Sequence, residues 1–181
     1  MAKPRRIVWD ACVWIATILQ EQAPLKGGGF EDRARLCNHV INQARRKQLE
    51  VLTSGLSLAE VCKDDGVKAE DGDMLADFFR NDYILIVPVD GYVGTKAREL
   101  MQLLFSEHPG LKPPDAIHLA TAFVADVPEL HTFDRKLLQI DQIRKSFFQA
   151  AGCCRYGSRR SRRRAYSTAC RLRTAVSASS R

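Results

Sequence analysis

The sequence predicts an α/β fold built on a parallel sheet. Short apolar runs alternate along the chain with segments of helical spacing, which is the pattern of successive βαβ units. The chain has 181 residues, 45% of them hydrophobic, which is enough for one domain with a real core. Four acidic residues, Asp10, Glu60, Asp115 and Asp134, lie near junctions between an apolar run and a helical segment. If the strands are parallel, these junctions share one edge of the sheet.

Each predicted element rests on its local pattern of apolar residues. Strands are assigned where apolar, β-branched and aromatic residues run together, and helices where apolar residues recur every three or four positions. In chain order the elements are a strand at 5–9, a helix at 11–19, a helix at 30–47, a strand at 49–53, a short helix at 57–62, a helix at 70–80, a strand at 84–89, a helix at 97–104, a helix at 115–123 and a strand at 129–133. A fifth strand is expected after Leu138, where the alternation fades, and its position is not assigned.

The charge of the chain is divided unevenly. Residues 151–181 carry nine arginines and no acidic residue, which leaves 19 basic and 21 acidic residues, a net charge of −2, in residues 1–150. We therefore predict a globular domain at 1–149 and a basic, Arg/Ser-rich tail at 150–181. The tail is either a disordered arm that raises nucleic-acid affinity or a non-native ending of the chain. The abrupt change of composition favours the second interpretation, a non-native ending.

Neither an export signal nor a membrane span is evident. The apolar run at 7–19 is interrupted by Asp10 and is too short to cross a bilayer. Cys12, Cys37 and Cys62 lie in apolar stretches and are expected to be reduced thiols of the core, and the tail cysteines lack the spacing of a zinc site. We expect a cytoplasmic protein that does not associate with membranes.

Four carboxylates at one edge would attract a cation. Like charges repel strongly when they are close, so the group persists only if protons or a metal ion relieve it, and a hard divalent cation suits oxygen ligands. Taken singly, each acid also fits the start of a helix. Glu60 stands three residues after Ser57 and could close a capping box. Asp10 fits this alternative least well, because it follows a buried apolar run where an uncompensated charge is costly.

Four segments of the chain resemble the PIN domain family, and especially the toxin ribonucleases of the VapC type. They are Ile7-Val8-Trp9-Asp10, the run from Ser57 to Val61, the run from Lys112 to Ala120, and the run from Thr132 to Leu137. Together they cover roughly residues 5–140. The resemblance implies a three-layer α/β/α sandwich, an endoribonuclease site dependent on Mg²⁺ or Mn²⁺, an RNA substrate, an antitoxin partner and a possible homodimer.

The same resemblance assigns roles to individual residues. Asp10, Glu60, Asp115 and Asp134 would form the acidic tetrad that binds the metal and carries out catalysis. Thr132 lies two residues before Asp134 on the same face of a strand, so it could orient a carboxylate or a metal-bound water.

Binding of RNA would require basic side chains beside the acids. The candidates near the predicted edge are Arg5, Arg6, Lys112, Arg135 and Lys136. They could equally form an ordinary solvated surface. His118, one turn after Asp115, is expected to be a packed or surface histidine, because a bound metal would already supply the base function.

Other functions fit the sequence less well. A phosphatase with an aspartyl nucleophile would want a second Asp two residues after the first, where Cys12 stands. A dinucleotide-binding site would need its glycines directly after the first strand, whereas the glycines at 27–29 follow a helix. The main alternative is a non-catalytic PIN-like module that binds RNA or protein and keeps its acids as helix caps. The presence of all four acids favours the enzyme.

Overall fold

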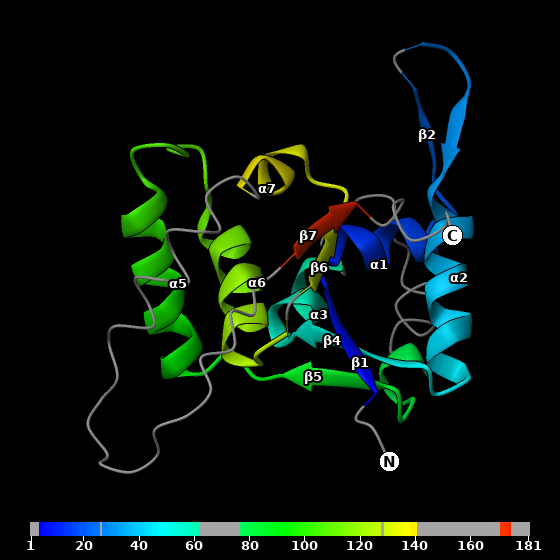
Figure 1. Cartoon of the computed structure of the whole chain (residues 1–181), viewed down its shortest axis with the longest axis horizontal. Helices are drawn as coiled ribbons and strands as arrows, with labels where there is room; N and C mark the ends of the chain where they lie inside the picture. The colour runs from blue at the N-terminus through cyan, green and yellow to red at the C-terminus, as the bar shows by residue number, and fades with distance from the viewer. Residues whose placement is uncertain (1–3, 26, 62–76, 128, 141–170, 175–181) are drawn as a thin grey trace, which may run out of the picture.

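A computed structural model describes residues 4–25, 27–61, 77–127, 129–140 and 171–174. Its elements are β1 (Arg5–Trp9), α1 (Ala11–Ile18), β2 (Gln22–Pro24), β3 (Phe30–Asp32), α2 (Arg33–Arg45), β4 (Leu49–Ser54), α3 (Gly55–Val61), β5 (Ile84–Val87), α5 (Gly91–Leu104), α6 (Pro113–Val124), β6 (Glu129–Thr132), α7 (Arg135–Gln139) and β7 (Arg171–Thr174). Five strands form one sheet in the order β5-β4-β1-β6-β7, and every pairing is parallel. Helices cover both faces of the sheet (Figure 1), so the predicted three-layer α/β/α sandwich is confirmed.

The alternation of side chains along β1 explains why both faces are covered. Ile7 and Trp9 pack into a core formed with α1 and α2, whereas Val8 packs into a second core formed with α5 and α6. Successive residues of a strand point to opposite faces, so a continuous apolar strand must be buried on both sides. Figure 1 shows the two pairs of helices on opposite sides of the sheet.

Two tryptophans fix the direction in which the chain leaves β1. The rings of Trp9 and Trp14 meet edge to face, with their centroids 4.7 Å apart. The indole N–H of Trp14 donates to the Thr53 hydroxyl at 3.0 Å, which ties α1 to β4. Asp10 lies between these two tryptophans in the sequence, at the start of α1.

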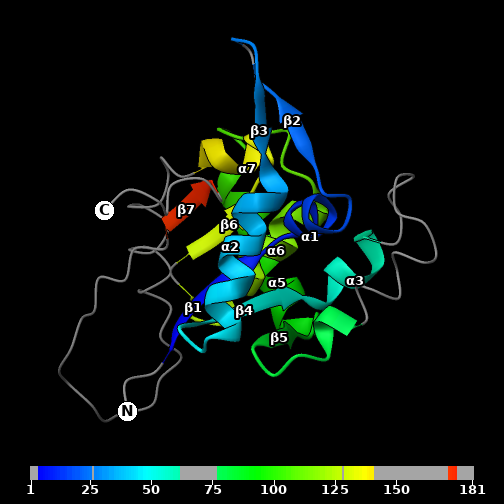
Figure 2. The ribbon, with the colours of Figure 1, turned by 90° about the vertical axis from the view of Figure 1, so that its right-hand side faces the viewer.

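The helix predicted at 30–47 begins three residues late. Residues 22–24 and 30–32 instead pair as an antiparallel hairpin, which stands out from the body of the molecule (Figure 2). Its turn uses Gly28 and Gly29 at φ of +90° and +85°, a conformation that costs glycine little. Asp32 then caps α2 by accepting a hydrogen bond from the Arg35 backbone N–H at 2.9 Å. Phe30, which was expected on the apolar helix face, is 69% exposed.

The fifth strand of the sheet is β7, which pairs with β6 from Glu129 opposite Arg171 to Thr132 opposite Thr174. It lies in the segment that the sequence assigns to the basic tail. The boundary between 149 and 150 stays a prediction, because residues 141–170 lie outside the described residues, as do Cys62 and most of the helix predicted at 70–80.

The other predicted elements are present, with shifted ends. The helix predicted at 97–104 starts at Gly91, because the Asp90 carboxylate accepts from the backbone N–H groups of Tyr92 and Val93 at 3.0 and 2.9 Å. The strand predicted at 84–89 ends at Val87, just before Pro88. Within the described residues, no helix combines the length and the apolar character needed to cross a bilayer.

Candidate active site

One cleft of about 600 Å³ opens where β1, β4 and β6 end and the following helices begin. All four predicted acids line it, together with Ala11, Cys12, Ile15, Leu56, Ala59, Pro114 and His118. The acids come from four separate segments of the chain, which the parallel sheet brings to a common edge. The predicted convergence of the four acids is therefore present in the structure.

Asp10 caps α1 and carries a buried carboxylate. It is 3% exposed, and its Oδ1 accepts hydrogen bonds from the Cys12 thiol at 2.8 Å and the Val13 backbone N–H at 3.3 Å. Burial raises the pKa of Asp10, although the Cys12 thiol, His118 and the Thr132 hydroxyl act in the opposite direction. The residue is thus a helix cap, and its carboxylate is also costly to ionise inside the cleft.

Cys12 is a free thiol that lines the cleft and also packs against the core. Its sulfur donates to Asp10 and accepts from the Phe133 backbone N–H at 3.0 Å, so it connects the start of α1 to the end of β6. Burial, reinforced by the Asp10 charge, raises the pKa of the thiol well above its usual value. Cys12 therefore stays protonated and acts as a hydrogen-bonding link. Cys37, in contrast, is buried as predicted.

Glu60 does not close a capping box. Helix α3 begins at Gly55, two residues before Ser57, and the Ser54 hydroxyl accepts from the Leu56 backbone N–H at 3.2 Å. The Glu60 carboxylate instead meets the ring of His118 on α6, with Oε2 and Nε2 2.7 Å apart. The alternative in which Glu60 serves only as a cap is wrong for this residue.

His118 is the cleft residue whose role the sequence did not reveal. It is 3% exposed, as the packed alternative expects, and it also lines the cleft. The available signal was its position three residues after Asp115, because residues i and i+3 of a helix share a face. Its partner, Glu60, is 58 residues away and could not be inferred from local pattern.

Asp115 combines a structural and an electrostatic role. Its Oδ2 accepts from the Lys112 backbone N–H at 3.2 Å at the start of α6, as the helix-start alternative expects. Partial burial raises the pKa of Asp115, and the charges of Asp134 and Glu60 raise it further, against the Lys112 hydrogen bond and His118. The carboxylates of Asp134 and Glu60 are therefore close enough to repel that of Asp115.

Asp134 and Thr132 form a local unit at the end of β6. The Asp134 carboxylate caps α7 by accepting from the Lys136 backbone N–H at 2.7 Å. Its own backbone N–H donates to the Thr132 hydroxyl at 2.9 Å, and Thr132 is fully buried. Thr132 thus orients the segment that carries Asp134.

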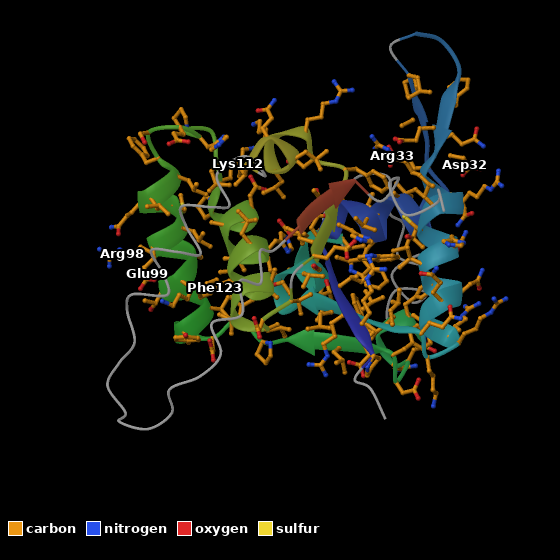
Figure 3. The ribbon with its side chains drawn as sticks, viewed as in Figure 1. Asp32, Arg33, Arg98, Glu99, Lys112 and Phe123 are labelled. Carbon is orange, nitrogen blue, oxygen red and sulfur yellow. The ribbon has the colours of Figure 1, made fainter. Side chains whose placement is uncertain are left out.

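The predicted basic residues separate into two groups. Lys112, Arg135 and Lys136 are exposed at the starts of α6 and α7, beside Asp115 and Asp134; Figure 3 labels Lys112.

Arg5 and Arg6 lie at the opposite, amino-terminal end of β1, about 13 to 17 Å of strand away from Asp10, contrary to expectation. There they form ion pairs with Glu129 and Glu50.

The chemistry of the cleft fits a hard divalent cation. Its acids supply oxygen ligands, and a cation would offset both the burial and the repulsion from Asp134 and Glu60 that raise the pKa of Asp115. In the described part of the chain, no three His, Cys, Asp or Glu side chains converge tightly enough to hold a metal ion. Binding would therefore require the carboxylates of the cleft to move closer to a common point.

Comparison with known families decides the identity of the domain. A profile of the PIN domain matches residues 7–143. The chain belongs to the PIN domain family. The match covers all four acids of the cleft and confirms the family predicted from the four sequence segments. No curated protein matches this PIN domain chain.

Solved structures share the PIN fold of this chain. VapC20 of Mycobacterium tuberculosis, a toxin that cleaves the sarcin-ricin loop, has a TM-score of 0.56 at 16% identity, over 74% of this chain and 93% of its own. VapBC2 of Rickettsia felis, bound to a DNA fragment from its promoter, has a TM-score of 0.54 at 16% identity, over 75% and 92%. FitAcB of Neisseria gonorrhoeae has a TM-score of 0.50 at 16% identity, over 74% and 91%. At this identity the likeness concerns the fold.

Proposed function

We propose that this PIN domain protein is a metal-dependent endoribonuclease. The observation that carries the proposal is the convergence of Asp10, Glu60, Asp115 and Asp134 on one cleft at the carboxyl edge of a parallel sheet. An isolated helix cap needs no such convergence. Burial makes the charged forms of Asp10 and Asp115 costly, and the charges of Asp134 and Glu60 add to the cost at Asp115, so this grouping favours a cation-binding site over four independent caps.

The four acids divide into two roles in this proposal. Asp10 and Asp115 would be direct metal ligands, and Glu60 and Asp134 would hold a second ion or position a water. A bound Mg²⁺ or Mn²⁺ would polarise the scissile phosphate and lower the pKa of the attacking water. The surrounding chain keeps these ligands in place: the Cys12 thiol and the Thr132 hydroxyl hold the segments that carry Asp10 and Asp134.

The rim of the cleft supplies the cations that an RNA backbone needs. Lys112, Arg135 and Lys136 are exposed beside the acids and would contact phosphates on either side of the scissile bond. Because residues 1–150 carry a net charge of −2, binding would rest on this local patch and would weaken as salt is raised.

Cleavage of labelled single-stranded RNA by the full chain tests the proposal. The assay is run with Mg²⁺ or Mn²⁺, with EDTA, and with the variant Asp10→Asn. Asp90→Asn is a matched control, because Asp90 also caps a helix but is exposed and lies outside the cleft. We expect cleavage by the parent chain and by Asp90→Asn, and none with EDTA or by Asp10→Asn. Parent-like cleavage by Asp10→Asn under excess metal would refute the assignment.

A non-catalytic binding module is the competing outcome of the same experiment. A folded parent chain that binds RNA in an anisotropy titration but leaves it uncut with either metal would support the module and reject the enzyme. The observation that favours the module is that no three His, Cys, Asp or Glu side chains of the described residues come close enough together to hold a metal ion.

We further propose that the protein is the toxin of a toxin–antitoxin pair and acts in the cytoplasm. The support is its fold, which it shares with VapC20, described as a toxin, and with VapBC2. A cleft lined by four acids suits an antitoxin that inserts a Lys or Arg side chain. Co-purification of a small partner that blocks cleavage would support this role, and sedimentation would show whether the chain forms a homodimer. Failure to find a partner would remove the toxin role and leave the nuclease unaffected.

A further inference from the structure

We infer that His118 is a positioning residue that holds the carboxylate of Glu60 in the cleft. The inference rests on the proposed function, because it concerns the ligand set of that same site. It assigns His118 no contact with substrate. The residue acts through the 2.7 Å contact between its Nε2 and Oε2 of Glu60.

The contact joins two elements that meet only in the folded structure. Glu60 is the next-to-last residue of the seven-residue helix α3, and His118 lies in the middle of α6. The Glu60 side chain is 27% exposed and has three rotatable bonds, so without a partner it would sample several rotamers. The His118 side chain is only 4% exposed and is fixed by its surroundings. A fixed donor holding a mobile carboxylate is the arrangement that orients metal ligands in proteins.

Packing alone does not explain a histidine at this position. Nδ1 of His118 is buried and has no hydrogen-bond partner in the described part of the chain. A buried ring nitrogen without a partner is unfavourable, and an apolar side chain of similar size would avoid that cost. What the imidazole adds over such a side chain is the hydrogen bond to Glu60.

Whether the His118 contact strengthens or weakens metal binding follows from the geometry of the Glu60 carboxylate. A carboxylate has two oxygens, so a bond from His118 to Oε2 leaves Oε1 able to turn toward a cation in the cleft that Asp10 and Asp115 also line. Removing the bond should therefore weaken metal binding. If His118 instead kept Glu60 away from the metal, its removal would strengthen binding.

Binding of Mn²⁺ to the full chain, followed by electron paramagnetic resonance, tests the inference without relying on cleavage. His118→Leu keeps the packing volume but removes the donor, and His118→Gln restores an N–H at a similar reach. We expect the Leu variant to bind Mn²⁺ about 10- to 100-fold more weakly, the range typical of losing a residue that orients a metal ligand. We expect the Gln variant to recover most of the affinity. Equal affinity of the parent and Leu variants, or tighter binding by Leu, would overturn the inference.

A second comparison separates a positioning role from a merely structural one. In the background of Glu60→Gln, the change His118→Leu should have no further effect on Mn²⁺ affinity, because its target carboxylate is gone. An undiminished effect there would mean that His118 acts through the general fold, and would also overturn the inference. A parent chain that neither binds Mn²⁺ nor cleaves RNA would instead refute the proposed function itself.

Discussion

Replacing Glu129 with Gln tests the buried polar network that joins β1 to β6. The Glu129 carboxylate contacts the Arg5 guanidinium and Nε2 of His131, and Nδ1 of His131 accepts from the Trp9 indole N–H at 3.2 Å. The Glu129 side chain is 8% exposed. Because β1 and β6 carry Asp10 and Asp134 at their ends, this network holds together the two strands that supply half of the acidic tetrad.

The size of the effect follows from the pKa of Glu129. Burial alone would raise that pKa, but hydrogen bonds from His131 and Arg5 outweigh burial and lower it from 4.5 to about 2. Each pKa unit corresponds to about 1.4 kcal/mol, so the ionised carboxylate stabilises the fold by about 3 kcal/mol. Because the pKa is depressed in the folded state, this stabilisation is complete above pH 4.5 and is lost as the pH falls toward 2.

Urea unfolding monitored by tryptophan fluorescence measures the change, since Trp9 belongs to the network. We expect Glu129→Gln to lower the free energy of unfolding by about 3 kcal/mol at pH 7, and the difference from the parent to narrow as the pH falls below 4.5. Glu50→Gln is the matched control, because Glu50 forms its ion pair with Arg6 at the surface. That variant should lose less than about 1 kcal/mol.

Two results would refute this reasoning. A difference between parent and Glu129→Gln that stays constant from pH 7 to pH 3 would mean that the carboxylate charge is not the source of the stability. A loss no larger than that of Glu50→Gln would mean that burial adds nothing to the network.

Three further predictions concern the cleft and the hairpin. Asp10→Asn should melt at a higher temperature than the parent in EDTA at pH 7, because it removes a charge whose pKa is raised by burial while Asn keeps the helix cap. Calorimetry should show this gain in melting temperature disappearing as the pH falls to 3.8, where the parent carboxyl group is protonated in the folded state; a lower melting temperature than the parent at pH 7 would contradict the prediction. Gly29→Ala should lower the free energy of unfolding in urea by about 1 kcal/mol, because φ at Gly29 is +85°. Gly94→Ala, in α5 with open space around it, should instead raise that free energy by up to about 1 kcal/mol. Equal effects of the two changes would reject the turn argument. Thr132→Val should cost about 1–2 kcal/mol and slow RNA cleavage, with Thr132→Ser close to the parent, because the hydroxyl accepts the Asp134 N–H.

The start of α2 and the last strand show where local pattern is insufficient. The apolar spacing from Phe30 onward fits a helix, yet Phe30 lies in a hairpin, because two glycines with positive φ allow a turn that periodicity does not record. Strand β7 lies where composition changes to arginine and serine, and only pairing with β6 makes that segment a strand. Propensity is a weak guide wherever tertiary contacts provide the stabilisation.

The positions of the four acids, in contrast, follow from local information. Strand periodicity, helix starts and βα junctions depend on neighbouring residues, so the sequence places Asp10, Glu60, Asp115 and Asp134 at one edge of a parallel sheet. Their partners do not follow from local information. The contact of His118 with Glu60 spans 58 residues, and that of Cys12 with the Phe133 backbone spans 121. Such contacts exist only once the strand order brings those segments together, because hydrogen bonding depends on distance in space and not on separation along the chain.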